Sequence, residues 1–212
     1  MTQTLTSSRQ HCKLPDVEDK LLSLIASDTD VLILLIYHFN ASMCSIFMQY
    51  ETSGRNKVVA VSIGDIWNKM TVDCVPQLLC AHAMTGCDTT SALFRRGKVG
   101  VWRLLSSSTV TLMSLSNTMS NADASHDDVL TDGLKLLVII YGGKPNSQLN
   151  QLRYTHYMNM LASSLTPRPE RLPPTENAAK FHIFRAHCQS FSGRHLGQLD
   201  WTQTRRNGLE SH

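Results

Sequence analysis

The stretch AHAMTGCDTTS, residues 81–91, decides how this chain can fold when it is read together with SDTD, residues 27–30. The two stretches supply three carboxylates, Asp28, Asp30 and Asp88, each at the end of an apolar segment. Close carboxylates repel one another unless a cation neutralises them, and oxygen ligands near phosphate suit Mg²⁺ or Mn²⁺. The pattern therefore predicts part of a divalent metal site.

The composition is that of a folded protein of moderate size. The 212 residues are 42% hydrophobic, which is enough to build a core. The formal net charge of +3 comes from the last part of the sequence, because residues 1–166 hold 13 basic and 13 acidic residues whereas residues 167–212 hold 7 and 4. A sequence pI of about 8.6 permits binding to nucleic acid without arguing for it.

The cysteines and the apolar runs restrict the cellular context. Six cysteines are scattered without a CxxC pair, and the polar residues 1–10 carry no signal-peptide core. Reduced thiols in a cytosolic or nuclear protein are expected. The longest apolar run, residues 31–37, is too short to span a bilayer, so no transmembrane segment is expected.

Hydrophobic patterning predicts an α/β fold with a small parallel sheet, flanking helices and a helical C-terminal part. Residues 21–26 form a short apolar run typical of a buried parallel strand. The run at residues 31–37 is expected to be buried on several sides. Residues 44–50 and 57–61 flank a turn-forming segment and predict a hairpin.

Capping signals place the helices that follow. Ser62, with Asp65 three residues later, predicts one helix start, and Pro76 and Gly86 predict the start and the stop of the next helix. The other expected elements are two short helices around a glycine turn within 92–105, a loop within 106–128, and helices at 129–141, 149–161 and 177–191.

Each aspartate has a structural and a functional interpretation. Asp28 and Asp30 follow a strand end, where ligand sites of open α/β sheets gather, but a solvated turn that caps the next element is the more common role of such residues. Asp88 follows the helix stop at Gly86 and could cap an element that begins at Thr89. The local sequence leaves both interpretations open.

The basic stretch after Asp88 predicts contacts to phosphate. Arg95, Arg96 and Lys98 can neutralise phosphate charge, and Gly97 and Gly100 let backbone N–H groups approach it. The alternative is an ordinary solvated loop.

Two motifs give the chain a family resemblance. SDTDVL at residues 27–32 and HAMTGCDTTSALFRRGK at residues 82–98 resemble the C-terminal part of PIN-like domains of the flap-endonuclease (FEN/XPG) type. They are most similar to an uncharacterised animal group that carries DTDVLVLL and LTGCDTTSA motifs. Residues 172–175, with His182 and Arg185, also resemble the tail of that group.

The resemblance implies a site and a substrate. In nucleases of this type the residues that match Asp28, Asp30 and Asp88 bind Mg²⁺ or Mn²⁺ beside the scissile phosphate of DNA. The helix-turn-helix after the GCD motif grips the duplex backbone, in the region of residues 95–100. Such nucleases also use acidic residues well upstream of the DxD motif, and the sequence is expected to lack that N-terminal part of the domain.

These expectations divide the chain into four regions. They are an expected disordered leader at 1–15, a partial PIN-like nuclease core with a helix-turn-helix-like segment at 16–105, a helical extension at 106–165, and a proline-containing connector with a basic C-terminal tail at 166–212. The predicted function is metal-dependent hydrolysis of DNA phosphodiesters. The alternative is a catalytically inactive remnant that binds nucleic acid or protein.

Two further groups of residues have other interpretations. Zinc could be bound by Cys74, Cys80, His82 and Cys87, or by His182, His187 and Cys188, but buried structural cysteines account better for this spacing. Base stacking could involve Tyr154, Tyr157, Phe181 and Phe184, although aromatic residues at helical spacing are more often in a core.

Overall fold

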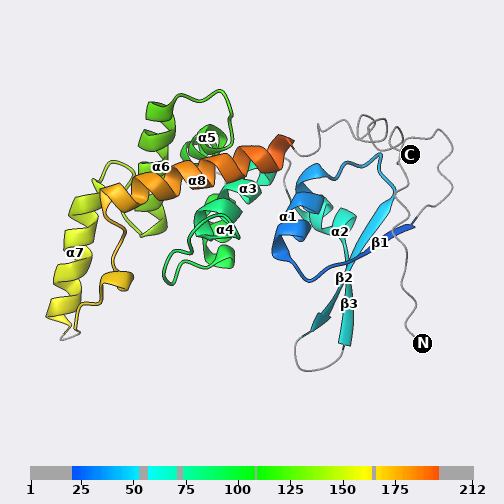
Figure 1. Ribbon diagram of the computed structural model, residues 1–212, viewed down its shortest axis with the longest axis horizontal. Coiled ribbons are helices and arrows are strands. Elements are labelled where there is room, and N and C mark those ends of the chain that lie inside the picture. Colours follow the sequence, from blue (N-terminus) through cyan, green and yellow to red (C-terminus); the bar gives the residue numbers. More distant parts are fainter. Residues whose placement is uncertain (1–20, 53–56, 71–73, 108, 164–165, 196–212) are drawn as a thin grey trace, which may run out of the picture. The chain divides into compact units, whose positions relative to one another are not determined.

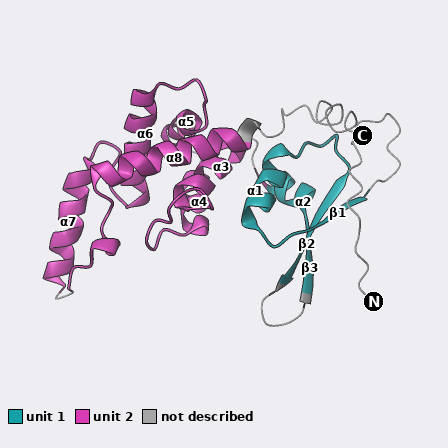
Figure 2. Cartoon of the chain, in the orientation of Figure 1, with its two compact units in different colours: residues 1–69 teal, residues 70–212 magenta. Residues whose placement is uncertain are grey.

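A computed structural model describes residues 21–52, 57–70, 74–107, 109–163 and 166–195 of the chain. The chain divides into two compact units, residues 1–69 and residues 70–212 (Figure 2). The predicted leader at 1–15 and the part of the predicted tail beyond residue 195 lie outside the described residues. The α/β class and the helical C-terminal part are confirmed (Figure 1).

The first unit is built on a three-stranded sheet. Its strands are β1 (Leu21–Ile25), β2 (Ser45–Thr52) and β3 (Lys57–Ser62), and they lie in that order. β1 is parallel to β2, whereas β2 and β3 are antiparallel, which confirms the hairpin. The sheet is therefore mixed and only its β1–β2 half is parallel.

The burial of β1 differs from the expectation. All five residues of the strand are exposed, including Leu21 at 68% and Ile25 at 70% relative accessibility. Among the described residues β1 is an edge strand that pairs only with β2, and the buried apolar side chains of this sheet are Ile46 and Met48 of the central strand. The apolar run of β1 was thus correctly predicted as a strand but wrongly predicted as buried.

Two helices complete the first unit. The run at residues 31–37 lies in α1 (Thr29–His38), where only Ile36 is fully buried. Helix α2 (Ile63–Lys69) begins as predicted, because the Ser62 hydroxyl accepts a hydrogen bond from the Asp65 N–H at 3.1 Å. Helix α1 provides the crossover that two parallel neighbouring strands require.

The second unit is helical. Its elements are α3 (Val75–Thr85), α4 (Lys98–Leu105), α5 (Val110–Met119), α6 (His126–Ile140), α7 (Leu149–Ala162), the short 3₁₀ helix η2 (Pro169–Arg171) and α8 (Glu176–His195). Helix α3 is buried over residues 77–85, because α4, α5 and α8 all pack against it. No helix in the described parts of the chain is long and apolar enough to cross a membrane.

Two sequence expectations for this unit need correction. Residues 91–97 form no helix, so α4 stands alone where two helices around a glycine turn were expected. Residues 106–128 contain helix α5 as well as the expected loop. The serine- and threonine-rich composition hid a helical stripe of buried residues, which are Leu112, Leu115, Ser116 and Met119.

Two buried histidines join α8 to its neighbours. The ring nitrogen Nε2 of His182 lies 3.1 Å from the Met84 carbonyl oxygen at the end of α3, and Nδ1 of His187 lies 3.1 Å from the Met119 carbonyl oxygen at the end of α5. Burial lowers the pKa of His182, outweighing the hydrogen bond to Met84, and the positive charge of Arg185 lowers the pKa further. The folded protein therefore favours the neutral imidazole.

Close packing between α6 and α8 depends on Gly133. A Cβ atom at this position would lie 2.9 Å from Cγ1 of Ile183 and closer still to its Cγ2. Both residues are fully buried, so the contact cannot relax into solvent.

We expect Gly133→Ala to destabilise the helical unit by about 1–3 kcal/mol, because the added methyl group overfills the α6–α8 contact. Chemical denaturation measures the change. Gly100→Ala is the matched control, since a Cβ atom there meets nothing within 4 Å, and it should leave the unfolding free energy unchanged or raise it by up to about 1 kcal/mol. Equal stabilities of the two variants would contradict the packing argument.

We also expect His182 to make the unfolding free energy depend on pH. Its pKa is lower in the folded than in the unfolded protein, where it is near 6.5, so the unfolded chain binds the proton first as the pH falls. This contribution is fully present above about pH 6.5 and is lost as the pH falls toward the folded pKa. Denaturation between about pH 7.5 and about pH 5.5 (roughly one unit either side of the ordinary pKa) should show a shallower slope in His182→Gln than in the wild type, and equal slopes would contradict the lowered pKa of His182.

Candidate functional site

The turn after α3 is held rigidly by its backbone. Gly86 ends the helix with φ 103°, and a Cβ atom there would lie 2.7 Å from Cα of Ala92. Cys87 and Thr90 then form an isolated antiparallel bridge through N–H···O bonds of 3.3 Å and 3.2 Å. Only glycine meets both the positive φ and the close approach, so the predicted helix stop is confirmed.

Two threonine side chains fix the same turn. The buried Thr90 hydroxyl donates to the Ala83 carbonyl oxygen at 2.8 Å and accepts from the Cys87 N–H at 3.0 Å. The Thr89 hydroxyl donates to Oε1 of Gln189 on α8 at 2.7 Å. The sulfur of Cys87 lies 3.4 Å from the Thr89 hydroxyl oxygen and 3.2 Å from that of Thr90, and against the effect of burial these hydrogen bonds lower the pKa of the thiol.

Asp88 occupies the tip of this turn. Its side chain is exposed, and among the described residues none donates a hydrogen bond to its carboxylate. No helix begins at Thr89, so the helix-cap interpretation of Asp88 is wrong. The turn holds a carboxylate toward solvent without using it structurally.

Asp28 and Asp30 have a different setting in the first unit. Asp28 is the N-cap of α1, and its Oδ1 accepts a hydrogen bond from the Asp30 N–H at 2.9 Å. This is the capping role that the sequence left open. Asp30 lies in the first turn of the helix, where a negative charge interacts favourably with the helix dipole. Asp28 and Asp30 belong to unit 1 and Asp88 to unit 2, and a metal ion shared by all three stays a prediction.

The basic stretch has partly structural roles. The guanidinium of Arg96 lies 4.9 Å from the centre of the Tyr141 ring, and Nζ of Lys98 donates to the Gly86 carbonyl oxygen at the end of α3. Burial raises the pKa of Tyr141, and the positive charges of Arg96 and Arg153 oppose the rise. Two of the three predicted phosphate-binding cations thus hold the fold together.

The remaining residues of the stretch are open to solvent. Arg95 is exposed with a positive φ of 56°, and its guanidinium lies 5.6 Å from the Phe94 ring. Gly97 is the N-cap of α4, and neither it nor Gly100 has a neighbour within 4 Å of an added Cβ atom. The space around both glycines is therefore open, although the Gly100 N–H already donates to the Gly97 carbonyl oxygen at 3.1 Å.

The structure brings together only half of the first zinc group, because ligand atoms of His82 and Cys87 lie within 4.8 Å of each other whereas Cys74 and Cys80 are not in that cluster. Cys80 is fully buried, and burial raises the pKa of its thiol to about 12, outweighing the lowering effect of the neighbouring Ser116 side chain. The Cys74 thiol is instead directed to the Ser106 carbonyl oxygen. In the second group His182 and His187 contact carbonyl oxygens of two different helices, whereas Cys188 is exposed. Structural roles account for Cys80, His182 and His187, as the spacing favoured.

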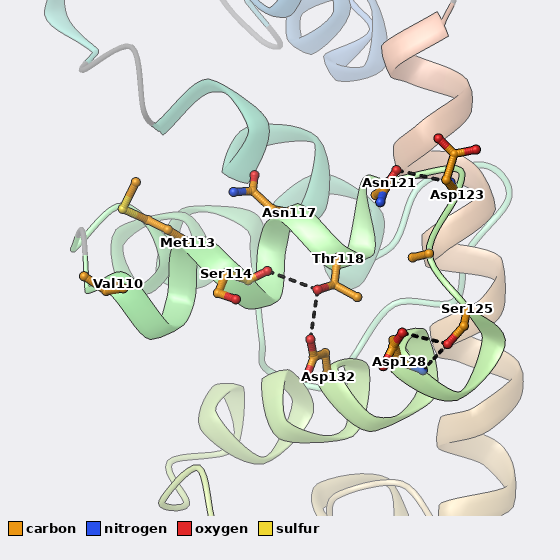
Figure 3. A pocket seen from close by; sticks show the side chains of 11 residues that line it. Val110, Met113, Ser114, Asn117, Thr118, Asn121, Asp123, Ser125, Asp128 and Asp132 are labelled. Atoms are coloured by element: carbon orange, nitrogen blue, oxygen red, sulfur yellow. Dashed lines mark hydrogen bonds between the residues drawn. The ribbon is translucent and has the colours of Figure 1, made fainter.

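One polar groove was missed by sequence reasoning. It lies beside α5 and the start of α6, has a volume of about 980 Å³, and carries the carboxylates of Asp123, Asp128 and Asp132 (Figure 3). The Thr118 hydroxyl donates to Asp132 at 2.9 Å, and Ser125 caps α6 by accepting from the Asp128 N–H at 3.1 Å. In the sequence, the Ser125-x-x-Asp128 spacing is a variant of a helix-capping motif and was the signal for the helix start beside this groove.

Comparison with known proteins found no match for the chain. No family model matches the chain, and neither a curated protein nor a solved structure matches it.

We expect Thr90→Val to destabilise the helical unit by about 1–3 kcal/mol, because it removes the buried hydroxyl donor of the Ala83 carbonyl oxygen and leaves the Cys87 N–H only its bond to the Thr90 carbonyl oxygen. The neighbouring Thr89→Val is the control, since Thr89 is exposed, and it should cost no more than about 0.5 kcal/mol. Urea denaturation compares the variants. A Thr90→Val protein as stable as the wild type would contradict a turn held by this hydroxyl.

Proposed function

We propose that the chain is a nuclease-related PIN-like domain that hydrolyses DNA phosphodiesters with Mg²⁺ or Mn²⁺. The proposal rests first on the resemblance of residues 27–32 and 82–98 to flap-endonuclease-type domains. The structural observation that supports it is Asp88, an exposed carboxylate at the tip of a rigid turn with no structural partner among the described residues. A turn so firmly fixed is suited to hold a ligand in place.

The donor set fits a hard divalent cation. Asp28, Asp30 and Asp88 offer only carboxylate oxygens, the ligands that Mg²⁺ and Mn²⁺ prefer. Asp28 uses Oδ1 for the helix cap, and a carboxylate that accepts one backbone hydrogen bond retains a second oxygen for a cation. When bound, such an ion would activate water and neutralise charge on the phosphodiester.

The chain itself would position the substrate. The exposed guanidinium of Arg95 and the exposed start of α4 at Gly97 would bind the phosphate backbone. Arg96 and Lys98 would act indirectly, because they fix α4 against Tyr141 and the end of α3. Contacts of this kind carry little sequence information, so selection by DNA structure rather than by base sequence is expected.

A second candidate function is a binding module without catalysis. Asp28 caps α1, and Arg96 and Lys98 make contacts within the helical unit. These structural roles favour the binding module, because they explain the presence of the three residues without catalysis. Such a module would still bind the nucleic-acid backbone through Arg95 and the start of α4. DNA cleavage separates the two candidates.

We expect the purified protein with Mn²⁺ to cleave flapped or single-stranded DNA, and Asp88→Asn to lower the rate by more than about 100-fold because it removes a direct metal ligand. Gel analysis of end-labelled oligonucleotides measures the rate. Asp127→Asn, which changes an exposed aspartate at the start of α6, should retain it. Wild-type activity no greater than that of Asp88→Asn would leave only the binding module.

A double-mutant cycle tests whether the aspartates share an ion. Calorimetry would give the Mn²⁺ affinities of the wild type, Asp28→Asn, Asp88→Asn and the double variant. A shared ion requires coupled effects, so the loss in the double variant should differ from the sum of the single losses by more than about 0.5 kcal/mol. Additive effects would place the two carboxylates in separate sites.

A further inference from the structure

The aromatic side chains of α7 are not in the core. Tyr154 is 57% and Tyr157 is 39% exposed, so the expectation that they are core residues is wrong. Phe181 of α8 is also exposed, and of the four aromatic residues considered together only Phe184 packs against the core. Large aromatic side chains exposed three residues apart on one helix form a continuous surface that needs an explanation.

These tyrosines line a groove between α7 and the segment that leads into α8. The groove has a volume of about 430 Å³, within the range of sites that hold small planar groups. Figure 1 shows α7 and the segment with η2 side by side. The lining that matters here consists of Arg153, Tyr154, Tyr157, Pro167, Pro169 and Leu172.

The shape and chemistry of this lining suit a nucleobase. The lining includes two phenol rings and two pyrrolidine rings, and stacking of a base on an aromatic ring does not depend on the identity of the base. The guanidinium of Arg153 is held in place, because its Nη1 donates to the Pro173 carbonyl oxygen.

The charge around the groove favours a polyanion. Residues 149–175 contain three arginines, Arg153, Arg168 and Arg171, and one acidic residue, Glu170. Arg168 is exposed and lies between Pro167 and Pro169, which line the groove. A cation on the rim of a stacking surface is the arrangement by which proteins bind single-stranded nucleic acid.

We propose that this groove binds single-stranded nucleic acid, with bases stacked on Tyr154 and Tyr157 and the phosphate backbone near Arg168. The inference rests on the proposed function, and it adds that the substrate has a single-stranded part that is bound away from the Asp88 turn. A base fits the groove better than a second copy of the chain would. The groove is lined by tyrosines and prolines, on which a base can stack, whereas the exposed aliphatic residues Met158 and Leu161, which a protein partner would cover, are not among its lining residues.

Binding of a fluorescein-labelled oligo(dT) of about 16 nucleotides, followed by anisotropy in EDTA so that no cleavage occurs, tests the groove. Tyr154→Ala/Tyr157→Ala should lower the affinity by at least about 10-fold, and Tyr154→Phe/Tyr157→Phe should retain it, since phenylalanine also stacks. Phe181→Ala is the control for loss of an exposed aromatic residue outside the groove, and it should bind like the wild type. An unchanged affinity of the double alanine variant would overturn the proposal.

Two comparisons separate stacking from its alternatives. An abasic strand of the same length keeps the phosphates but offers no bases, so it should bind more weakly than oligo(dT), and equal affinities would contradict stacking. Light scattering reports the molar mass. A dimeric wild type that becomes monomeric in the double alanine variant, with unchanged DNA affinity, would assign the surface to self-association and overturn the proposal.

The same assay distinguishes this inference from the proposed nuclease function. Asp88→Asn should bind oligo(dT) as the wild type does, because Asp88 is not part of the groove. Binding without any metal-dependent cleavage would refute the nuclease and support the groove. The opposite result would refute only the proposal for the groove. In that case cleavage depends on Asp88, and Tyr154→Ala/Tyr157→Ala changes neither the cleavage rate nor the affinity for oligo(dT).

Discussion

Burial of helix α3 is the constraint on which the helical unit depends. The helix has buried side chains from Gln77 to Thr85, and α4, α5 and α8 surround it. A helix covered on every side cannot continue into solvent without exposing apolar surface, so the chain must turn away sharply where it ends. Gly86 makes that turn possible because its backbone adopts a positive φ in contact with Ala92.

The end of α3 is also a point where side chains from several elements of the unit form hydrogen bonds. Its last carbonyl groups are bonded by side chains from three later segments, namely Thr90 in the turn, Lys98 at the start of α4 and His182 of α8. Carbonyl oxygens at a helix end lack helical partners, and burial would make them costly if they were left alone. The GCDTT motif is therefore at once a helix terminus and the support of Asp88.

The residues predicted for the site fall into two groups, those that have a structural role in the fold and those that have none among the described contacts. Arg96, Lys98 and Asp28 carry internal contacts, so their presence in a motif is explained without a ligand. Asp88, Arg95, Tyr154 and Tyr157 are exposed, and within the described part of the chain no capping or core role accounts for them. Substitutions of these four residues are therefore the most informative about function, because they change exposed side chains without a structural role.

Local signals in the sequence determined the elements. The Ser62 cap, the Gly86 stop, the hairpin and the helices that start at Leu149 and Glu176 follow from interactions within a few residues, which short patterns record. Only the tertiary structure decided which apolar faces are covered, because burial depends on partners far away in the chain. It left β1 exposed as an edge strand, found a buried stripe in the serine-rich α5, and turned Tyr154 and Tyr157 outward beside the segment that precedes α8.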